Sequence, residues 1–179
     1  MKIIKHIRTI HKHKWEVFKL CVKAGIPWQG ITHDLSKLNP VEFIPAIKYA
    51  TGESSPHHIE RKRKGYSAAW LHHKGRNKHH AHYWLDDVPG GMVPMPFKYA
   101  VENICDRIGA NKAYNSKDYK DSDPLHYWMN IQNTRTNDRM LIHPNTKAFI
   151  EETLSRLSTE GEKIINKKTL KEIYDKHHI

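Results

Sequence analysis

The chain has 179 residues, 38% hydrophobic and 27% charged, which is enough for one domain with a substantial core. A formal net charge of +11 favours anionic partners, either phosphorylated small molecules or nucleic acid. The sequence contains no apolar run long enough for a membrane helix and no secretory signal, which argues against a membrane or a secreted protein. Its only two cysteines, Cys21 and Cys105, are far apart, which argues against a disulfide framework. These features predict a cytoplasmic protein.

Helical periodicity dominates from the first residues onward. Apolar residues recur at three- and four-residue steps, which predicts one long helix that ends at Gly25. A short second helix is expected over residues 27–34. The Asn39-Pro40 pair is typical of a helix start, and we expect this third helix to run to about Ala50.

Similar signals predict helices along the rest of the chain. We expect them from Ser55 to before Gly75 with a break at Gly65, from Asn77 to about Leu85, from Pro96 to about Ala110, and from near Asp123, Asn145 and Thr169. Residues 86–95, rich in Gly and Pro, are expected to form a loop. The sequence therefore predicts an all-α, single-domain helical bundle over 1–179, with its active face in about 1–110 and a helical C-terminal extension over 116–179.

The unusual feature of the composition is its fifteen histidines, many of them in clusters. His13 lies inside the apolar stripe of the first helix, whereas His11 is displaced by about 200° and points away. A histidine that faces the core must form a hydrogen bond or bind a metal ion. Taken alone, His13 is open to both explanations.

The adjacent pair His33-Asp34 joins an imidazole to a carboxylate on one short stretch, which suits a divalent cation. Lys37 follows three residues later and is expected either to hold a phosphate or to pair with Asp34. A His-Asp dipeptide is a weak signal when it stands alone, because it occurs by chance in many chains.

A third group of histidines flanks the turn at Gly75. His73 and His80 share helical faces with aromatic residues on the two sides of this turn, so they are well placed to share a metal ion, and His79 is an alternative. The other explanation of this segment is a histidine-rich polar turn over aromatic packing.

Two carboxylates, Glu102 and Asp106, stand four residues apart on one helix face. Like charges at this spacing repel each other unless a cation lies nearby. A metal ion would meet that need, and so would a basic side chain such as Arg107.

The order of these residues is similar to that of the HD superfamily of metal-dependent phosphohydrolases: a histidine on the first helix, a His-Asp pair with a following lysine, further histidines, and an aspartate in a helix that reads D-R-I-x-A. The resemblance covers about residues 13–110 and implies an HD-like fold. The residues that match its single-metal site are His13, His33, Asp34 and Asp106. Members with extra histidines in the interval hold two ions, and the residues of that interval are His73, His79 and His80.

The whole chain also resembles an uncharacterised bacterial and phage family. The shared motifs are KHK at 12–14, HDLSK at 33–37 and GYSAAWLHHKGRNKHH at 65–80. This second resemblance implies no substrate.

These residues predict a metal-dependent phosphohydrolase with one or two divalent transition-metal ions (Mn, Fe, Co, Ni or Zn) that acts on a nucleotide or a related phosphoester. Lys37 would stabilise negative charge, and Glu102 would act as general base or as the hydrogen-bond partner of a ligating histidine. Arg76 and Lys78 are the predicted substrate-binding residues. The basic run at 61–64 would either guide an anionic substrate or form a solvated helix face.

Two other functions fit parts of this pattern. A diiron HD-type oxygenase would use the same ligands, require iron and consume O₂. A non-catalytic, basic nucleic-acid-binding protein would lose affinity steeply with salt and would keep it when His33 and Asp34 are replaced. No helix-turn-helix or zinc-finger spacing supports the latter.

Overall fold

The computed structural model describes residues 2–50, 55–134 and 141–177, and this part of the chain is helical, with one isolated β-bridge between Leu85 and Met92. The α-helices are α1 (Lys2–Lys23), α2 (Pro27–Thr32), α3 (Pro40–Lys48), α4 (Pro56–Lys64), α5 (Ala68–Arg76), α6 (Phe97–Asn115), α7 (Asp123–Thr134), α8 (Pro144–Glu160) and α9 (Lys167–His177). Short 3₁₀ helices are η1 (Leu35–Leu38), η2 (Ala81–Trp84), η3 (Ser116–Asp118) and η4 (Glu162–Ile164). The predicted all-α, single-domain bundle is confirmed.

Local sequence accounts for several helix boundaries. The Asn39 side chain accepts a hydrogen bond from the backbone N–H of Val41 at 3.0 Å and so caps α3, as predicted. Ser67 caps α5 in the same way, because its hydroxyl oxygen accepts from the backbone N–H of Trp70. Gly65 separates α4 from α5 with a φ of +83°, a conformation that glycine adopts without strain.

The prediction of a helix from Asn77 to about Leu85 is wrong. Asn77 instead follows the last residue of α5, where its side-chain amide donates to the carbonyl oxygen of His73 at 2.8 Å and its backbone is extended. Between Asn77 and Leu85 the only helical element is the 3₁₀ turn at Ala81–Trp84. An asparagine side chain can satisfy backbone groups at either end of a helix, so its presence did not distinguish an end from a start.

Three other boundaries differ from the prediction. The second helix ends at Thr32, because Asp34 adopts a left-handed backbone with a φ of +56°. Helix α5 continues through Gly75 to Arg76, at a position where an added Cβ would meet nothing within 4 Å. Helix α6 continues five residues beyond Ala110, to Asn115.

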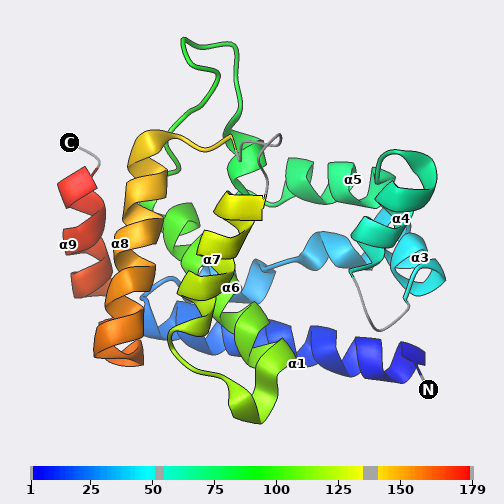
Figure 1. Cartoon of the computed structure of the whole chain (residues 1–179), viewed down its shortest axis with the longest axis horizontal. Coiled ribbons are helices and arrows are strands. Elements are labelled where there is room, and N and C mark those ends of the chain that lie inside the picture. Colours follow the sequence, from blue (N-terminus) through cyan, green and yellow to red (C-terminus); the bar gives the residue numbers. More distant parts are fainter. Residues whose placement is uncertain (1, 51–54, 135–140, 178–179) are drawn as a thin grey trace.

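Helices α1 and α6 pack against each other more extensively than any other pair of described helices, and in Figure 1 α1 runs along the lower side of the molecule. Gly109 permits their close approach, because a Cβ there would lie 2.6 Å from Cγ2 of Val17 and 3.5 Å from the carbonyl oxygen of His13. This crossing sets His13 on α1 beside Asp106, which lies about one turn before Gly109 on α6.

The apolar core extends from this crossing into the C-terminal helices. Its largest fully buried side chains include Leu20, Ile104, Ile108, Trp128, Phe149, Ile150, Leu154, Leu170 and Ile173. In Figure 1, α8 and α9 lie side by side at one end of the molecule, and α3, α4 and α5 gather at the other. The C-terminal helices α7, α8 and α9, which were expected as an extension, therefore supply much of the core.

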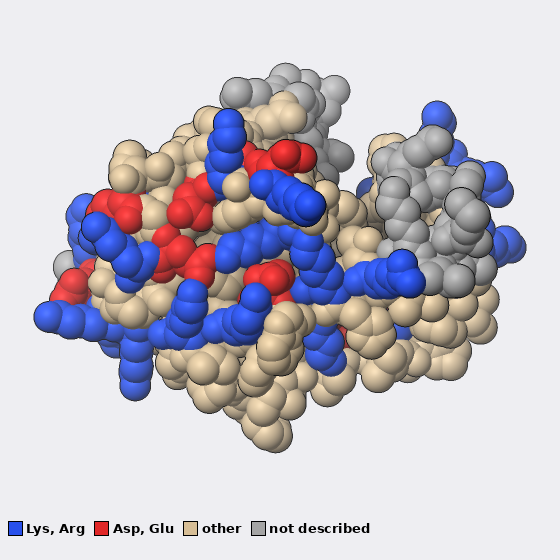
Figure 2. All heavy atoms as spheres, turned by 90° about the horizontal axis from the view of Figure 1, so that it is seen from below, with Lys and Arg blue, Asp and Glu red and all other residues tan. Residues whose placement is uncertain are grey.

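The surface is mixed in charge. Figure 2 shows basic and acidic side chains interspersed on one face, so the net charge of +11 does not form one continuous basic patch there. Cys21 and Cys105 are both buried and free. Among the described helices, none has the length and apolar character needed to cross a membrane.

Candidate metal centre

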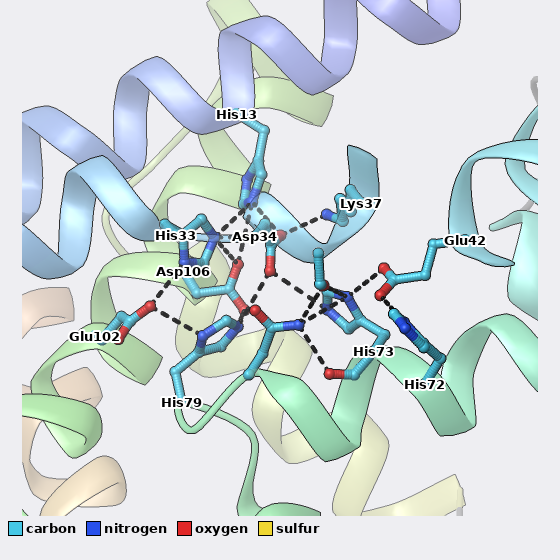
Figure 3. A network of polar contacts seen from close by, with 12 residues as sticks. His13, His33, Asp34, Lys37, Glu42, His72, His73, His79, Glu102 and Asp106 are labelled. Carbon is cyan, nitrogen blue, oxygen red and sulfur yellow. Dashed lines mark hydrogen bonds and ion pairs between the residues drawn. The ribbon is translucent and has the colours of Figure 1, made fainter. Parts of the chain in front are cut away.

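Residues from widely separated parts of the sequence converge between α1, α5 and α6, and most of them are labelled in Figure 3. They are His13 on α1, His33 and Asp34 directly after α2, His73 on α5, His79 and His80 after α5, and Glu102 and Asp106 on α6. The fold thus brings together every residue that was predicted to bind metal. All except His13, His80 and Asp106 are buried, and these three are partly buried.

The first group of potential ligands joins α1 to α6. The Nε2 atom of His13 lies 3.2 Å from Oδ1 of Asp106 and 3.4 Å from Nε2 of His33. His33 Nε2 lies 3.5 Å from the same Asp106 oxygen and 3.3 Å from Oδ2 of Asp34. Adjacent ligand atoms around an ion with bonds of about 2.1 Å lie roughly 3.0–3.5 Å apart, so these distances suit a metal ion.

The second group surrounds the other oxygen of Asp34. Its Oδ1 lies 3.4 Å from Nε2 of His73 and 3.6 Å from Nε2 of His79, and His80 completes a set whose ligand atoms are all within 4.8 Å of one another. Three buried atoms of this set, Asp34 Oδ1, His79 Nε2 and His80 Nε2, have no hydrogen-bond partner. Burying such atoms unpaired is costly, and a cation would satisfy all three.

Asp34 belongs to both groups, because its two carboxylate oxygens point to different sets of histidines. Oδ2 faces His13 and His33, while Oδ1 faces His73 and His79. The donor set of imidazole nitrogens and carboxylate oxygens suits divalent transition metals, and the ligand atoms of each group lie close enough together that they could hold a metal ion.

Glu102 lies behind the ligands and orients two of them. Its Oε1 accepts hydrogen bonds from Nδ1 of His33 at 3.1 Å and from Nδ1 of His79 at 3.0 Å. Because a carboxylate only accepts, both Nδ1 atoms hold protons, and the Nε2 atoms remain for metal coordination. Of the two roles predicted for Glu102, this geometry supports that of a hydrogen-bond partner.

Glu42 plays the equivalent part for the second group. Its Oε2 accepts from Nδ1 of His73 at 2.8 Å, and its Oε1 accepts from Nδ1 of His72 at 2.6 Å. The side chain is almost fully buried, so these bonds are shielded from solvent. His73 is consequently held with its Nε2 towards Asp34.

Protons balance the charges within the cluster. Burial lowers the pKa of His33, but the carboxylates of Asp34, Asp106 and Glu102 outweigh burial and raise that pKa to about 10. Burial would raise the pKa values of Asp34 and Asp106, yet the neighbouring histidines hold both well below the usual range. Protons and any bound metal ion would therefore compete for the same nitrogen atoms.

Lys37 lies at the edge of the cluster, with its Nζ 2.5 Å from Oδ2 of Asp34. Burial lowers its pKa, but the Asp34 carboxylate more than compensates and raises it. The side chain is one-third exposed and lines a cavity that also reaches His13 and Asp106. Both roles predicted for Lys37 are compatible with this position.

The two predicted substrate-binding residues lie at the surface. Arg76 is exposed at the last position of α5, and Lys78 is exposed with its ammonium 5.5 Å from the ring centroid of Tyr83. That they bind substrate stays a prediction.

Glu42 and Asn77 are two members of the network that sequence reasoning missed as site residues. Glu42 stands three residues after the helix cap Asn39, and a local capping role was enough to explain it. Asn77 donates to the Ser36 hydroxyl at 2.7 Å as well as to His73, whereas the sequence suggested a helix start. The available signal was the polarity of both residues beside the histidine motifs.

The fold and the cluster define an all-α protein with a buried histidine–carboxylate centre that can hold metal ions. Residues 2–156 match a family described as "Family of unknown function (DUF5662)", and the chain belongs to this family. No curated protein and no solved structure matches the chain.

Proposed function

We propose that this protein is a metal-dependent phosphohydrolase of the HD type that hydrolyses a nucleotide or a related phosphoester. The main support is the convergence of three buried polar atoms without hydrogen-bond partners, Asp34 Oδ1, His79 Nε2 and His80 Nε2. A second support is the arrangement of the HD-like residues on either side of Asp34. The basic composition favours an anionic substrate.

The proposed ligands divide between two positions. One ion would be held by His13, His33, Asp34 and Asp106, and the other by Asp34, His73, His79 and His80. Divalent ions bound there would activate water and polarise a phosphoryl oxygen. Glu102 and Glu42 keep protons on the Nδ1 atoms of the coordinating histidines, which leaves the Nε2 atoms free to bind.

Lys37 would act on the substrate side of the centre. Its ammonium fixes the Asp34 carboxylate and faces the cavity between α1 and α6. Positive charge at this point stabilises the negative charge that develops on a phosphoryl group during hydrolysis.

Metal content per chain is the first test. Untagged wild-type protein should contain one or two equivalents of a divalent transition metal, and the His33→Ala/Asp34→Ala variant should lose them. His11→Ala is the matched control, because His11 is exposed on the same helix as His13. Equal metal content in all three proteins would contradict the proposed centre.

Activity separates this proposal from its alternatives. Protein loaded with Mn²⁺, Co²⁺ or Mg²⁺ should release phosphate from p-nitrophenyl phosphate or a nucleoside monophosphate, and the double variant should not. Iron-dependent O₂ consumption without phosphate release would indicate an oxygenase instead. Salt-sensitive nucleic-acid binding that survives the double substitution would indicate a non-catalytic binding protein.

A further inference from the structure

Arg107 is a basic residue next to the candidate metal centre, and its charge has no acidic partner in the described part of the chain. It follows Asp106 on α6, and its Nε donates to Oδ1 of Asn103 at 2.8 Å. Its guanidinium carbon lies 4.4 Å from the ring centroid of Trp128, which is fully buried. Among the described residues, no carboxylate lies within ion-pair distance of this guanidinium.

An unpaired guanidinium in partly buried surroundings is energetically unfavourable. The Trp128 ring compensates only part of the lost hydration, because a cation–π contact is weaker than a buried ion pair. A bound anion would provide the missing counter-charge.

A cavity places this guanidinium beside the candidate metal ligands. It lies between α5, α6 and α7, and its lining includes Trp70, His80, Asp106, Arg107, Asn111 and Tyr127. His80 and Asp106 belong to the two ligand groups of the centre. An anion in this cavity would therefore lie next to both Arg107 and the metal ions.

The cavity on the other side of the centre is less suited to an anion. It lies between α1 and α3, and its lining is largely apolar, including Ile10, Phe43 and Ile47. Its one lysine, Lys37, is already paired with Asp34, and its lining also includes the carboxylate of Glu42. Lys37 also lines the cavity beside His13 and Asp106. Of these three cavities, only the one that contains Arg107 therefore offers a lysine or arginine without a carboxylate partner among the described residues.

We infer that Arg107 binds a phosphate-like group of the substrate in the cavity between α5, α6 and α7, beside His80 and Asp106. The inference rests on the proposed function for the link between anion binding and turnover. Arginine suits this task because its planar guanidinium can donate two parallel hydrogen bonds to a tetrahedral oxyanion. Arg107, in place of the exposed Arg76 and Lys78, is then the main residue that determines specificity for an anionic substrate.

Calorimetric titration with methylphosphonate tests the inference on the metal-loaded protein. Arg107→Gln should lower the affinity for methylphosphonate about tenfold or more, and Arg107→Lys should lower it less, because the charge remains. Arg156→Gln is the control, since Arg156 pairs with Glu160 on the exposed part of α8. Metal content and melting temperature should be the same in Arg107→Lys and wild type, which shows that the fold is retained.

The outcomes for the two proposals can be told apart. Unchanged methylphosphonate affinity in both Arg107 variants, or no binding by wild type, would overturn the role of Arg107 even if the protein hydrolyses phosphoesters. Loss of affinity in Arg107→Gln, in a protein that binds metal but hydrolyses no phosphoester, would support the anion site and contradict the phosphohydrolase.

Discussion

Two regions of the molecule are buried to a similar degree by opposite kinds of side chain. Around α6, α8 and α9 the buried residues are mainly apolar, and Phe149 and Leu154 are both 0% exposed. Between α1, α5 and α6 they are histidines and carboxylates, and His33 and His79 are both 1% exposed. Burial therefore does not distinguish a structural core from a candidate functional site.

Hydrogen-bond partners do distinguish the two regions. In the apolar region, Oγ1 of Thr146 accepts from the backbone N–H of Met95 at 2.9 Å, and Oγ1 of Thr153 donates to the carbonyl oxygen of Phe149 at 2.7 Å. In the histidine region, Asp34 Oδ1 has no such partner. Thr146 and Thr153 are thus satisfied by the protein itself, whereas a bound cation would satisfy Asp34 and add stability to the histidine region.

Among the changes that separate the two regions, metal removal should have the largest effect on the free energy of unfolding. At free metal a thousandfold above its dissociation constant, binding adds about 4 kcal/mol to the free energy of unfolding. A chelator should thus lower the melting temperature of wild type by roughly 8–16 °C. The melting temperature of Asp34→Ala should not respond to chelator, and a response equal to that of wild type would argue against a metal centre at Asp34.

Leu154→Ala should affect the apolar region alone. Truncating this fully buried side chain should reduce the free energy of unfolding by about 2–5 kcal/mol, measured by denaturant titration. Metal content should stay at the wild-type value, because the substitution leaves the histidine cluster intact. Leu71→Ala, on the half-exposed Leu71 of α5, is the control and should cost far less. Loss of metal from Leu154→Ala would show that the two regions are not independent.

Glu102→Gln should weaken metal binding in the histidine region without abolishing it. The substitution removes the charge that orients His33 and His79, and changes of this kind lower metal affinity about 10–100-fold. Metal dissociation constants from competition with a coloured chelator provide the measurement. Glu160→Gln, at the exposed end of α8, should leave the affinity unchanged. If Glu102→Gln and Glu160→Gln bind metal with equal affinity, Glu102 does not support the metal-binding histidines.

The smallest effect is expected from pH. The pKa of His33 is raised from 6.5 to about 10 in the folded protein, so its contribution to stability is complete below pH 6.5 and is lost as the pH rises towards 10. Between pH 7 and 8, chelator-treated protein should lose at most about 1.4 kcal/mol from this group. Metal-loaded protein should respond in the opposite sense, because fewer protons compete with the metal ions. Melting curves of the chelator-treated and the metal-loaded protein at pH 7 and pH 8 would measure these opposite responses. The same direction of change in both samples would contradict the prediction.

Local sequence determined the helical class and much of the helix order. Such features depend on residues that are neighbours in the sequence, so periodicity and capping rules predict them directly. Examples are the apolar stripe of α1, the cap at Asn39 and the break at Gly65. The inward position of His13 and the pair His33-Asp34 followed from the same reasoning. Membership of the HD superfamily remains a prediction.

Only the tertiary structure decided which of these residues act together. The sharing of Asp34 between two histidine groups, the support of His73 by Glu42, and the unpaired charge of Arg107 all depend on contacts between helices far apart in the sequence. The close crossing of α1 and α6 at Gly109 brings several of these helices together. Spacing along one helix predicts which face a side chain occupies, but the partner on another helix is set by packing, and metal sites are made of such partners.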